Sequence, residues 1–386
     1  MDSDWAGLPQ HLLDLVVDRL VAQLDFARFS IMCMSWHSVA KHNQSHRAKL
    51  LGRDQPPMLM VSTDQEGTWN LCNLMDEKVL DLQVNLSNKR FCGSSKGWVI
   101  IGEENFAVTL LDPLSRTKGK EEKENSIIRL PPLITPPDDK GGALEFWTEN
   151  YEYYVHKATL TADPILNANE CVVVVIFGHY SNMAFLRLSK DTTWTYVDEV
   201  TGIREVVCIE NKFYVVDVWS RIFTFDITTQ SYSDIKFVAQ GIKRTPFMLQ
   251  YLVALNDKEL LMVHRLSELD EDDMYVTKQV KIFELNFDEH KWIEKKTLGD
   301  IAIFVGDNSS LAVPASNFPG YQPNFIYFNH FNDRAFSNHE LQYGVDFGAY
   351  DVENQCFLAP YSTLTKTMTK MAQCPPIWVV PTFRLI

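Results

Sequence analysis

The first fifty residues carry apolar side chains at the spacing of an amphipathic helix. The side chains that share this spacing are Leu13, Val16, Val17, Leu20 and Leu24. Pro9 suits the first turn of a helix because its ring fixes φ and its missing N–H would have no partner there, so we predict that the helix starts at about Pro9. Leu12 and Leu15 lie outside the stripe, which makes this helix more apolar than one buried face requires.

A second apolar segment follows, and Asp25 is placed to cap its N-terminus. The spacing again collects the large side chains on one side of a helix. These side chains are Phe26, Phe29, Met32, Cys33 and Trp36. Two or three short helices are near the lower limit for independent folding, and their surplus apolar surface indicates an interface with another protein. The alternative is that they pack on the rest of the same chain.

Beyond Gln55-Pro56-Pro57 the helical periodicity gives way to short apolar runs that are rich in β-branched and aromatic residues. The clearest runs are residues 98–101, 107–111, 172–177, 213–218, 222–225, 260–263, 280–283 and 325–328. Aromatic residues make up 12% of the chain, which suits sheets packed face to face. The pattern therefore predicts a large all-β domain.

A weak repeat runs through this β region. An apolar run ends in Asp or Asn, a polar turn follows, and an aromatic side chain comes six residues after the Asp or Asn. The copies are Asp226 with Tyr232, Asn286 with Trp292 and Asp351 with Phe357, with looser copies at Asp112 and at Ser189 to Trp194. This layout predicts hairpins with polar turns. The spacing suits a β-propeller of about six blades, with a pair of β-sandwiches as the alternative.

Composition narrows the choice of partners. The chain has 386 residues, a formal net charge of −14 and seven cysteines without a C-x-x-C pair. Charges balance in residues 1–55, so the body is acidic and has no basic stripe, which disfavours nucleic acid. No apolar run is long enough to span a membrane, and the scattered cysteines indicate reduced thiols. We therefore expect a protein of the nucleus or cytoplasm that binds neither nucleic acid nor membrane.

Four possible metal ligands are close together near the N-terminus. They are Cys33, His37, His42 and His46. Their spacing fits no common zinc site, and Cys33 belongs to the apolar face. The chain also lacks a G-x-S-x-G motif, a phosphate-binding glycine loop and a repeated carboxylate motif. We therefore predict no metal, no cofactor and no catalytic residue. The alternative, a propeller hydrolase acting on a carbohydrate or small ester, would need a deep central pocket with converging carboxylates or a His near a nucleophile.

The N-terminal residues occur in a distinctive order, with Leu8-Pro9, then Leu12-Leu13 and later Cys33-x-x-Trp36. Over residues 5–46 this order resembles the F-box, the module by which substrate receptors attach to a Skp-family adaptor in cullin–RING ubiquitin ligases. Met32 stands where the family usually has Val, which keeps an apolar side chain. The resemblance implies three helices that bind the adaptor. The implied adaptor-binding residues are Leu8, Pro9, Leu12, Leu13, Val17, Leu20, Phe29, Met32, Cys33 and Trp36.

The β region contains short motifs whose order is more informative than any one of them. They are Gly97-Trp98-Val, Asp112-Pro113, Leu130-Pro-Pro-Leu133, Asn324-Phe-Ile-Tyr327-Phe and Pro375-Pro-Ile-Trp378-Val-Val-Pro381. Together, after an F-box, they resemble the C-terminal domain of a large plant F-box family, long of unknown function and now described as a β-propeller. The resemblance covers nearly all of residues 58–386 and implies that the propeller recognises the target.

We therefore predict a small all-α F-box module at residues 1–50, a linker at 51–57 and a β-propeller at 58–386. The predicted function is that of the substrate-recognition subunit of an SCF-type E3 ubiquitin ligase. The helices would bind a Skp-family adaptor, and through it cullin and RING subunits, while the propeller would bind an unknown target protein. The chain itself would catalyse nothing. A scaffold that binds the adaptor without ubiquitylation is a further alternative.

Overall fold

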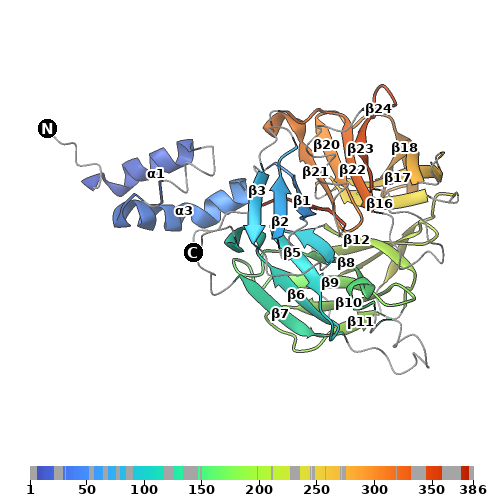
Figure 1. Ribbon diagram of the computed structural model, residues 1–386, viewed down its shortest axis with the longest axis horizontal. Helices are drawn as coiled ribbons and strands as arrows, with labels where there is room; N and C mark the ends of the chain where they lie inside the picture. Colours follow the sequence, from blue (N-terminus) through green and yellow to red (C-terminus); the bar gives the residue numbers. More distant parts are fainter. Residues whose placement is uncertain are drawn as a thin grey trace. The chain divides into compact units, whose positions relative to one another are not determined.

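The computed structural model divides the chain into two compact units (Figure 1). One comprises Met1–Pro56 and Pro381–Ile386, and the other comprises Pro57–Val380. The described residues are 7–20, 29–30, 32–51, 56–63, 68–74, 79–83, 90–116, 126–133, 147, 150–197, 199–209, 212–226, 235–243, 245, 248–256, 258–269, 271, 275–318, 320–331, 345–358 and 375–381.

The first unit contains helices α1 (Gln10–Arg19) and α3 (Met34–Leu51). Pro9 is the N-cap residue of α1 with φ −56°, so the predicted start of this helix is confirmed. The segment from Phe26 to Trp36 is not a single helix, because Met32 and Cys33 lie outside helical structure and α3 starts at Met34. The Ser30 carbonyl oxygen lies 3.2 Å from Nδ1 of His37, within hydrogen-bond distance. Residues Leu24, Asp25 and Phe26 are outside the described residues.

The second unit consists of six antiparallel or mixed sheets, the blades of a β-propeller. Blade 1 contains β1 (Met58–Ser62), β2 (Thr68–Cys72), β3 (Val79–Gln83) and β25 (Ile377–Val379). Blade 2 contains β4 (Phe91–Ser95), β5 (Trp98–Gly102), β6 (Ala107–Leu111) and β7 (Ile127–Pro132). Blade 3 contains β8 (Val155–Leu160), β9 (Val172–Phe177), β10 (Asn182–Arg187) and β11 (Thr195–Val197).

The remaining blades continue in chain order. Blade 4 contains β12 (Ile203–Ile209), β13 (Lys212–Asp217), β14 (Ile222–Asp226) and β15 (Lys236–Ala239). Blade 5 contains β16 (Met248–Ala254), β17 (Leu260–Leu269), β18 (Tyr275–Asn286) and β19 (Lys291–Lys295). Blade 6 contains β20 (Ile301–Val305), β21 (Ser310–Pro314), β22 (Phe325–Phe331), β23 (Val345–Asp351) and β24 (Cys356–Leu358). The prediction of a propeller with about six blades is confirmed.

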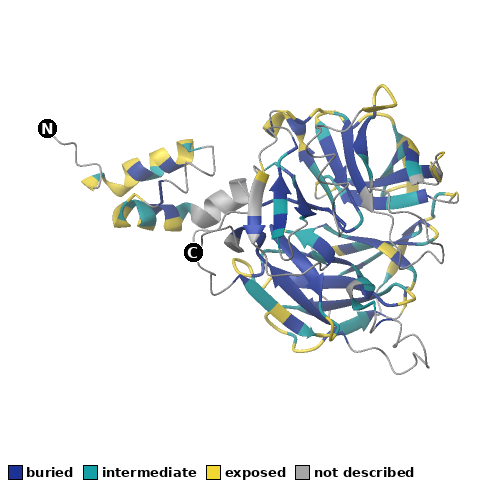
Figure 2. Cartoon of the chain, viewed as in Figure 1, coloured by how far each residue is buried: buried dark blue, intermediate teal, exposed yellow. Residues whose placement is uncertain are grey.

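Apolar clusters fill the space between each pair of neighbouring blades. Strand β9 shows why whole runs are apolar: Val173 and Val175 pack toward blade 2, whereas Val172 and Val174 pack toward blade 4. Side chains alternate between the two faces of a strand, and here both faces are covered. Figure 2 shows the resulting band of buried strands.

The weak sequence repeat marks the turn before the last strand of a blade. Asn286 ends β18 and Trp292 lies in β19, while Asp351 ends β23 and Phe357 lies in β24. Oδ1 of Asp351 accepts hydrogen bonds from two backbone N–H groups of its turn, at 3.0 Å each. The polar side chain therefore closes the turn, as the pattern predicts. Tyr232 lies outside the described residues.

The ring closes through the last strand of the chain. β25 pairs antiparallel with β1 and joins the first sheet as its end strand. Nε1 of Trp378 donates a hydrogen bond to the Val305 carbonyl at 3.1 Å, and Nδ2 of Asn329 donates to the Pro376 carbonyl at 2.7 Å. A Cβ on Gly306 would lie 2.2 Å from Oδ1 of Asn329, so only glycine fits there. Blades 1 and 6 are thus joined by packed and hydrogen-bonded groups.

Candidate functional site

The helices of the first unit have a small core of their own. Leu13, Val17 and Phe29 are buried there, and the Phe29 ring stacks on Trp36 with 4.6 Å between centroids. Nδ2 of Asn43 on α3 donates a 2.7 Å hydrogen bond to Oδ1 of Asp14 on α1. Leu13, Val17 and Leu20 of the apolar stripe predicted for α1 therefore hold the helices together, whereas Val16 of that stripe is exposed.

The predicted adaptor-binding residues divide into three groups by burial. Leu13, Val17 and Phe29 are buried. Leu8, Leu20, Cys33 and Trp36 are half-buried. Pro9, Leu12 and Met32 are exposed. The buried group stabilises the unit, and the exposed and half-buried groups are accessible to another protein.

Several large apolar side chains of the helical unit are exposed to solvent. Leu12, Leu15 and Val16 are exposed on α1, Leu15 by 49%. Met32 is exposed by 65%, and Met34, the first residue of α3, is exposed as well. The sequence prediction named neither Leu15, Val16 nor Met34 as site residues. The sequence contained a signal for Leu15 and Val16, because with Leu12 they occupy positions i, i+3 and i+4, which share one face of a helix.

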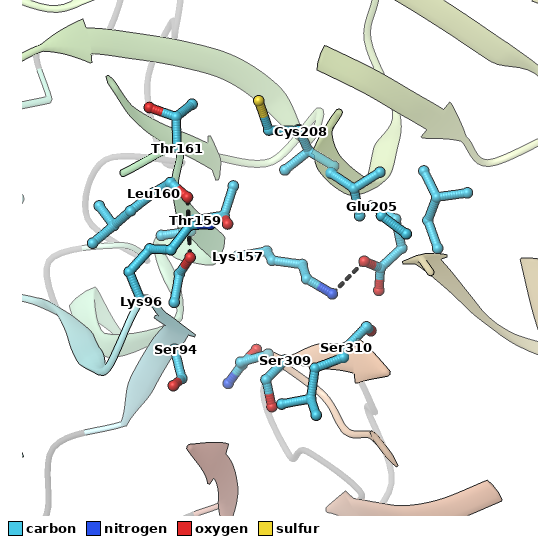
Figure 3. Close-up of a pocket in the computed structure, with 18 of the residues that line it drawn as sticks. Ser94, Lys96, Lys157, Thr159, Leu160, Thr161, Glu205, Cys208, Ser309 and Ser310 are labelled. Carbon is cyan, nitrogen blue, oxygen red and sulfur yellow. Dashed lines mark hydrogen bonds and ion pairs between the residues drawn. The ribbon is translucent and has the colours of Figure 1, made fainter. Parts of the chain in front are cut away.

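The described part of the propeller contains a pocket along its innermost strands (Figure 3). Strands β4, β8, β12, β16 and β21 all contribute to its wall, and its volume is about 410 Å³. The polar lining includes Ser94, Ser95, Thr161, Ser309 and Ser310. A small hydrophilic molecule or water would fit this lining better than an apolar ligand.

A buried ion pair crosses this pocket. Lys157 on β8 and Glu205 on β12 point toward one another and are hydrogen-bonded (Figure 3). Burial raises the pKa of Glu205 to about 7, because removal of water outweighs the attraction of the Lys157 ammonium. Glu205 is therefore engaged in an ion pair that links blades 3 and 4. The hydrolase alternative needs converging carboxylates, whereas Glu170 is the other carboxylate in the described lining and is exposed.

The raised pKa of Glu205 predicts that the free energy of unfolding depends on pH. The folded state holds the Glu205 proton more tightly than the unfolded state, so this group lowers the free energy of unfolding as pH rises from its ordinary pKa of 4.5 to about 7. Urea titrations of the wild type and Glu205→Gln at about pH 5 and about pH 7.5 measure the effect. The wild type is expected to lose more stability over this interval than the variant. An equal or opposite change would show that Lys157 outweighs burial.

Metal binding and membrane insertion can be assessed for the described residues. Within them, no group of three His, Cys, Asp or Glu side chains is arranged to hold a metal ion. Likewise, no described helix is long and apolar enough to cross a membrane.

The fold defines a β-propeller protein with an N-terminal helical unit. The family model described as KIB1-4 beta-propeller matches residues 71–351, more than half of the chain. The chain therefore belongs to the KIB1-4 β-propeller family.

Similar proteins come from Arabidopsis thaliana. F-box protein SKIP23 is 23% identical over 419 residues, which cover 97% of this chain and 95% of the relative. Probable F-box protein At1g65740 is 24% identical, with 84% of this chain and 89% of the relative covered. F-box protein At2g17036 is also 24% identical, with 81% and 80% covered. The resemblance to plant F-box proteins with a C-terminal propeller is confirmed, and none of these names states a catalytic activity.

Proposed function

We propose that this chain is the substrate-recognition subunit of an SCF-type ubiquitin ligase. The helical unit binds a Skp-family adaptor, and the propeller binds a target protein. The observation that carries this proposal is the set of exposed apolar side chains, Leu12, Leu15, Val16, Met32 and Met34, on a unit that has a core of its own. Membership in a propeller family whose relatives are named F-box proteins supports it.

The described chain leaves part of the apolar surface of its helical unit uncovered. Large apolar side chains that gather on a small helical unit favour burial against a partner helix face. Catalysis would then depend on position alone. Holding a target beside a ubiquitin-charged enzyme raises the effective concentration of the reacting groups, so this subunit needs no bond chemistry of its own. We place this activity in the nucleus or cytoplasm, where the free thiols of the described cysteines are maintained.

Adaptor capture tests the proposal. Leu12→Asp combined with Leu15→Asp is expected to lower capture of a purified plant Skp-family adaptor by the full chain at least about tenfold, because two charges would enter the apolar contact. Pull-down or surface plasmon resonance measures the loss. Leu13→Asp is a poorer test, because Leu13 is buried and its substitution would unfold the helices.

Two controls make the adaptor result specific. Ile293→Asp places the same charge at an exposed apolar site on β19 of the propeller and should leave capture unchanged. Circular dichroism of the double variant should show its helical signal intact. Capture of the double variant at wild-type strength would contradict the proposal.

A further inference from the structure

The turn between β13 and β14 displays a tryptophan to solvent. Trp219 is exposed by 61%, although its backbone is firmly held. The Trp219 N–H donates a 2.9 Å hydrogen bond to Oδ1 of Asp217. A Cβ on Gly241 would lie 1.9 Å from the Trp219 carbonyl oxygen, so the next segment packs directly against the turn. The backbone that carries the exposed Trp219 ring is therefore held in place.

The polar groups of the turn are satisfied within the propeller. Asp217 is buried and accepts hydrogen bonds from N and Nε of Arg221, at 2.9 Å and 2.6 Å. Ser220 has φ +63°, and its hydroxyl bonds to Oε1 of Gln250 on the neighbouring blade at 2.5 Å. An anchor that is already fixed loses little conformational entropy when a ligand binds.

A series of contacts between aromatic rings and one guanidinium runs from Trp219 along blade 4. The Arg221 guanidinium lies 4.8 Å from the Trp219 ring centroid and 5.4 Å from that of Phe223. Phe223 in turn contacts the exposed ring of Phe237, with 5.8 Å between centroids. Trp219 and Phe237 are thus the exposed ends of one row of contacting side chains.

Blade 3 adds a further exposed ring on a neighbouring turn. Tyr180, in the turn between β9 and β10, is exposed by 66%. Its carbonyl accepts a 2.7 Å hydrogen bond from the Gly202 N–H, and the Gly202 carbonyl accepts a 2.8 Å bond from the Val218 N–H. The two turns therefore lie side by side. We call Tyr180, Trp219, Arg221, Phe223 and Phe237 the aromatic surface.

The charge around the aromatic surface is opposite to that of the whole protein. Arg204 and Lys243 are exposed and lie two residues from Gly202 and Gly241 respectively. Lys236 is also exposed, but it pairs with Thr224 and therefore lies on the face of β15 opposite to Phe237. Asp217 is buried in its ion pair with Arg221, and Glu199 is an exposed acid nearby in sequence. The chain as a whole has 50 acidic and 36 basic side chains. Two exposed cations of this acidic protein, Arg204 and Lys243, therefore lie close in sequence to the segments that contact the turns of Tyr180 and Trp219.

We propose that the aromatic surface docks an acidic, extended segment of the target protein that carries an aromatic or proline anchor. Trp, Tyr and Arg are the side chains that dominate binding energy in protein interfaces. The cations at its rim attract carboxylates and orient the segment, while the rings bury its anchor. This inference rests on the proposed function as a substrate receptor and names the chemistry of the target.

Peptide selection tests the inference without a known target. Random peptides of about twelve residues, displayed on phage, are selected on the full chain bound to its Skp-family adaptor, with counter-selection on the same complex carrying Trp219→Ala. Enriched peptides are expected to be net acidic and to contain an aromatic residue or proline. Enrichment of basic peptides, or no enrichment over counter-selection, would overturn the inference.

Affinity measurements on one enriched peptide define the surface. Trp219→Ala should weaken binding at least about tenfold. Arg204→Glu with Lys243→Glu should weaken it similarly and reduce its salt dependence between about 0.05 M and about 0.5 M NaCl. Ile293→Ala removes an exposed apolar side chain on blade 5 and should change nothing. Binding unaffected by Trp219→Ala, or self-association of the wild type that this substitution abolishes, would contradict peptide docking.

Adaptor capture separates failure of this inference from failure of the proposed function. The Trp219→Ala variant should capture the adaptor as well as the wild type, because α1 and the start of α3 are unchanged. A wild-type chain that captures the adaptor but selects no peptide refutes the docking surface alone. A chain that fails to capture the adaptor refutes the proposed function, and peptide selection on the free chain then decides whether the surface binds.

Discussion

Arg265→Ala is expected to lower the free energy of unfolding of the propeller by about 3–5 kcal/mol, because it leaves a largely buried carboxylate without its cation. The Arg265 side chain is 0% exposed. Nη2 of Arg265 on blade 5 lies 2.6 Å from Oδ2 of Asp346 on blade 6, and Nη1 donates to the Tyr251 hydroxyl at 2.8 Å. The guanidinium also lies 4.1 Å from the Phe328 ring centroid. One side chain therefore connects two blades through charge, hydrogen bonds and ring packing.

Urea denaturation followed by tryptophan fluorescence measures this loss. Lys291→Ala breaks an ion pair with Glu289 in which both side chains are more than half exposed, and should change stability by less than about 1 kcal/mol. Arg265→Met combined with Asp346→Leu should recover part of the loss, because it removes both charges together. A single Arg265→Ala variant as stable as the Lys291 control would contradict a stabilising role for the buried group.

Trp378→Ala is expected to cost about 3–5 kcal/mol, because it empties a large buried site at the closure of the ring. Trp378 is in β25 and contacts Phe304 on blade 6 with 5.1 Å between ring centroids. Its backbone N–H donates to Oγ of Ser309 at 3.2 Å, in addition to the bond from its indole. β25 has three residues, so few other contacts can compensate.

Trp219→Ala is the matched control for this tryptophan. It removes a ring of the same size from an exposed position and should lower the free energy of unfolding by less than about 1 kcal/mol. Urea denaturation compares the two variants, and limited proteolysis near the C-terminus should be faster for Trp378→Ala alone. Equal stability of the two variants would show that closure by β25 contributes little.

Much of the architecture followed from local patterns. The start of α1 after Pro9 is confirmed because ring geometry acts on the nearest residues. The run Val172–Phe177 became β9 because six apolar residues in an extended chain can be buried on both faces of one strand. The turn residues Asn286 and Asp351 marked the outer hairpins through hydrogen bonds within their own turns. The domain boundaries predicted at residues 50 and 58 stay predictions.

Other features depend on which distant segments meet. Leu12 and Leu13 are adjacent and chemically identical, yet one is exposed and the other is buried, because Phe29 and Val39 cover one side of α1. Blade 6 pairs β20 with β22 in parallel, an arrangement that the hairpin repeat did not predict. The alternation of apolar and polar residues predicts that a side chain is buried, but it does not predict which residues cover that side chain.

By itself, the sequence determined the two kinds of structure, their order and the family they resemble, because helix and strand periodicities and turn residues act over a few positions. The tertiary structure alone decided that Arg265 meets Asp346, that Lys157 meets Glu205 in the pocket, and that Gly202 joins the turns of Tyr180 and Trp219. It also decided that Val16 of the predicted stripe remains exposed while Leu13 and Val17 are buried. These pairings arise from closing the ring and packing the helices, where contacts between remote residues compensate the loss of chain entropy.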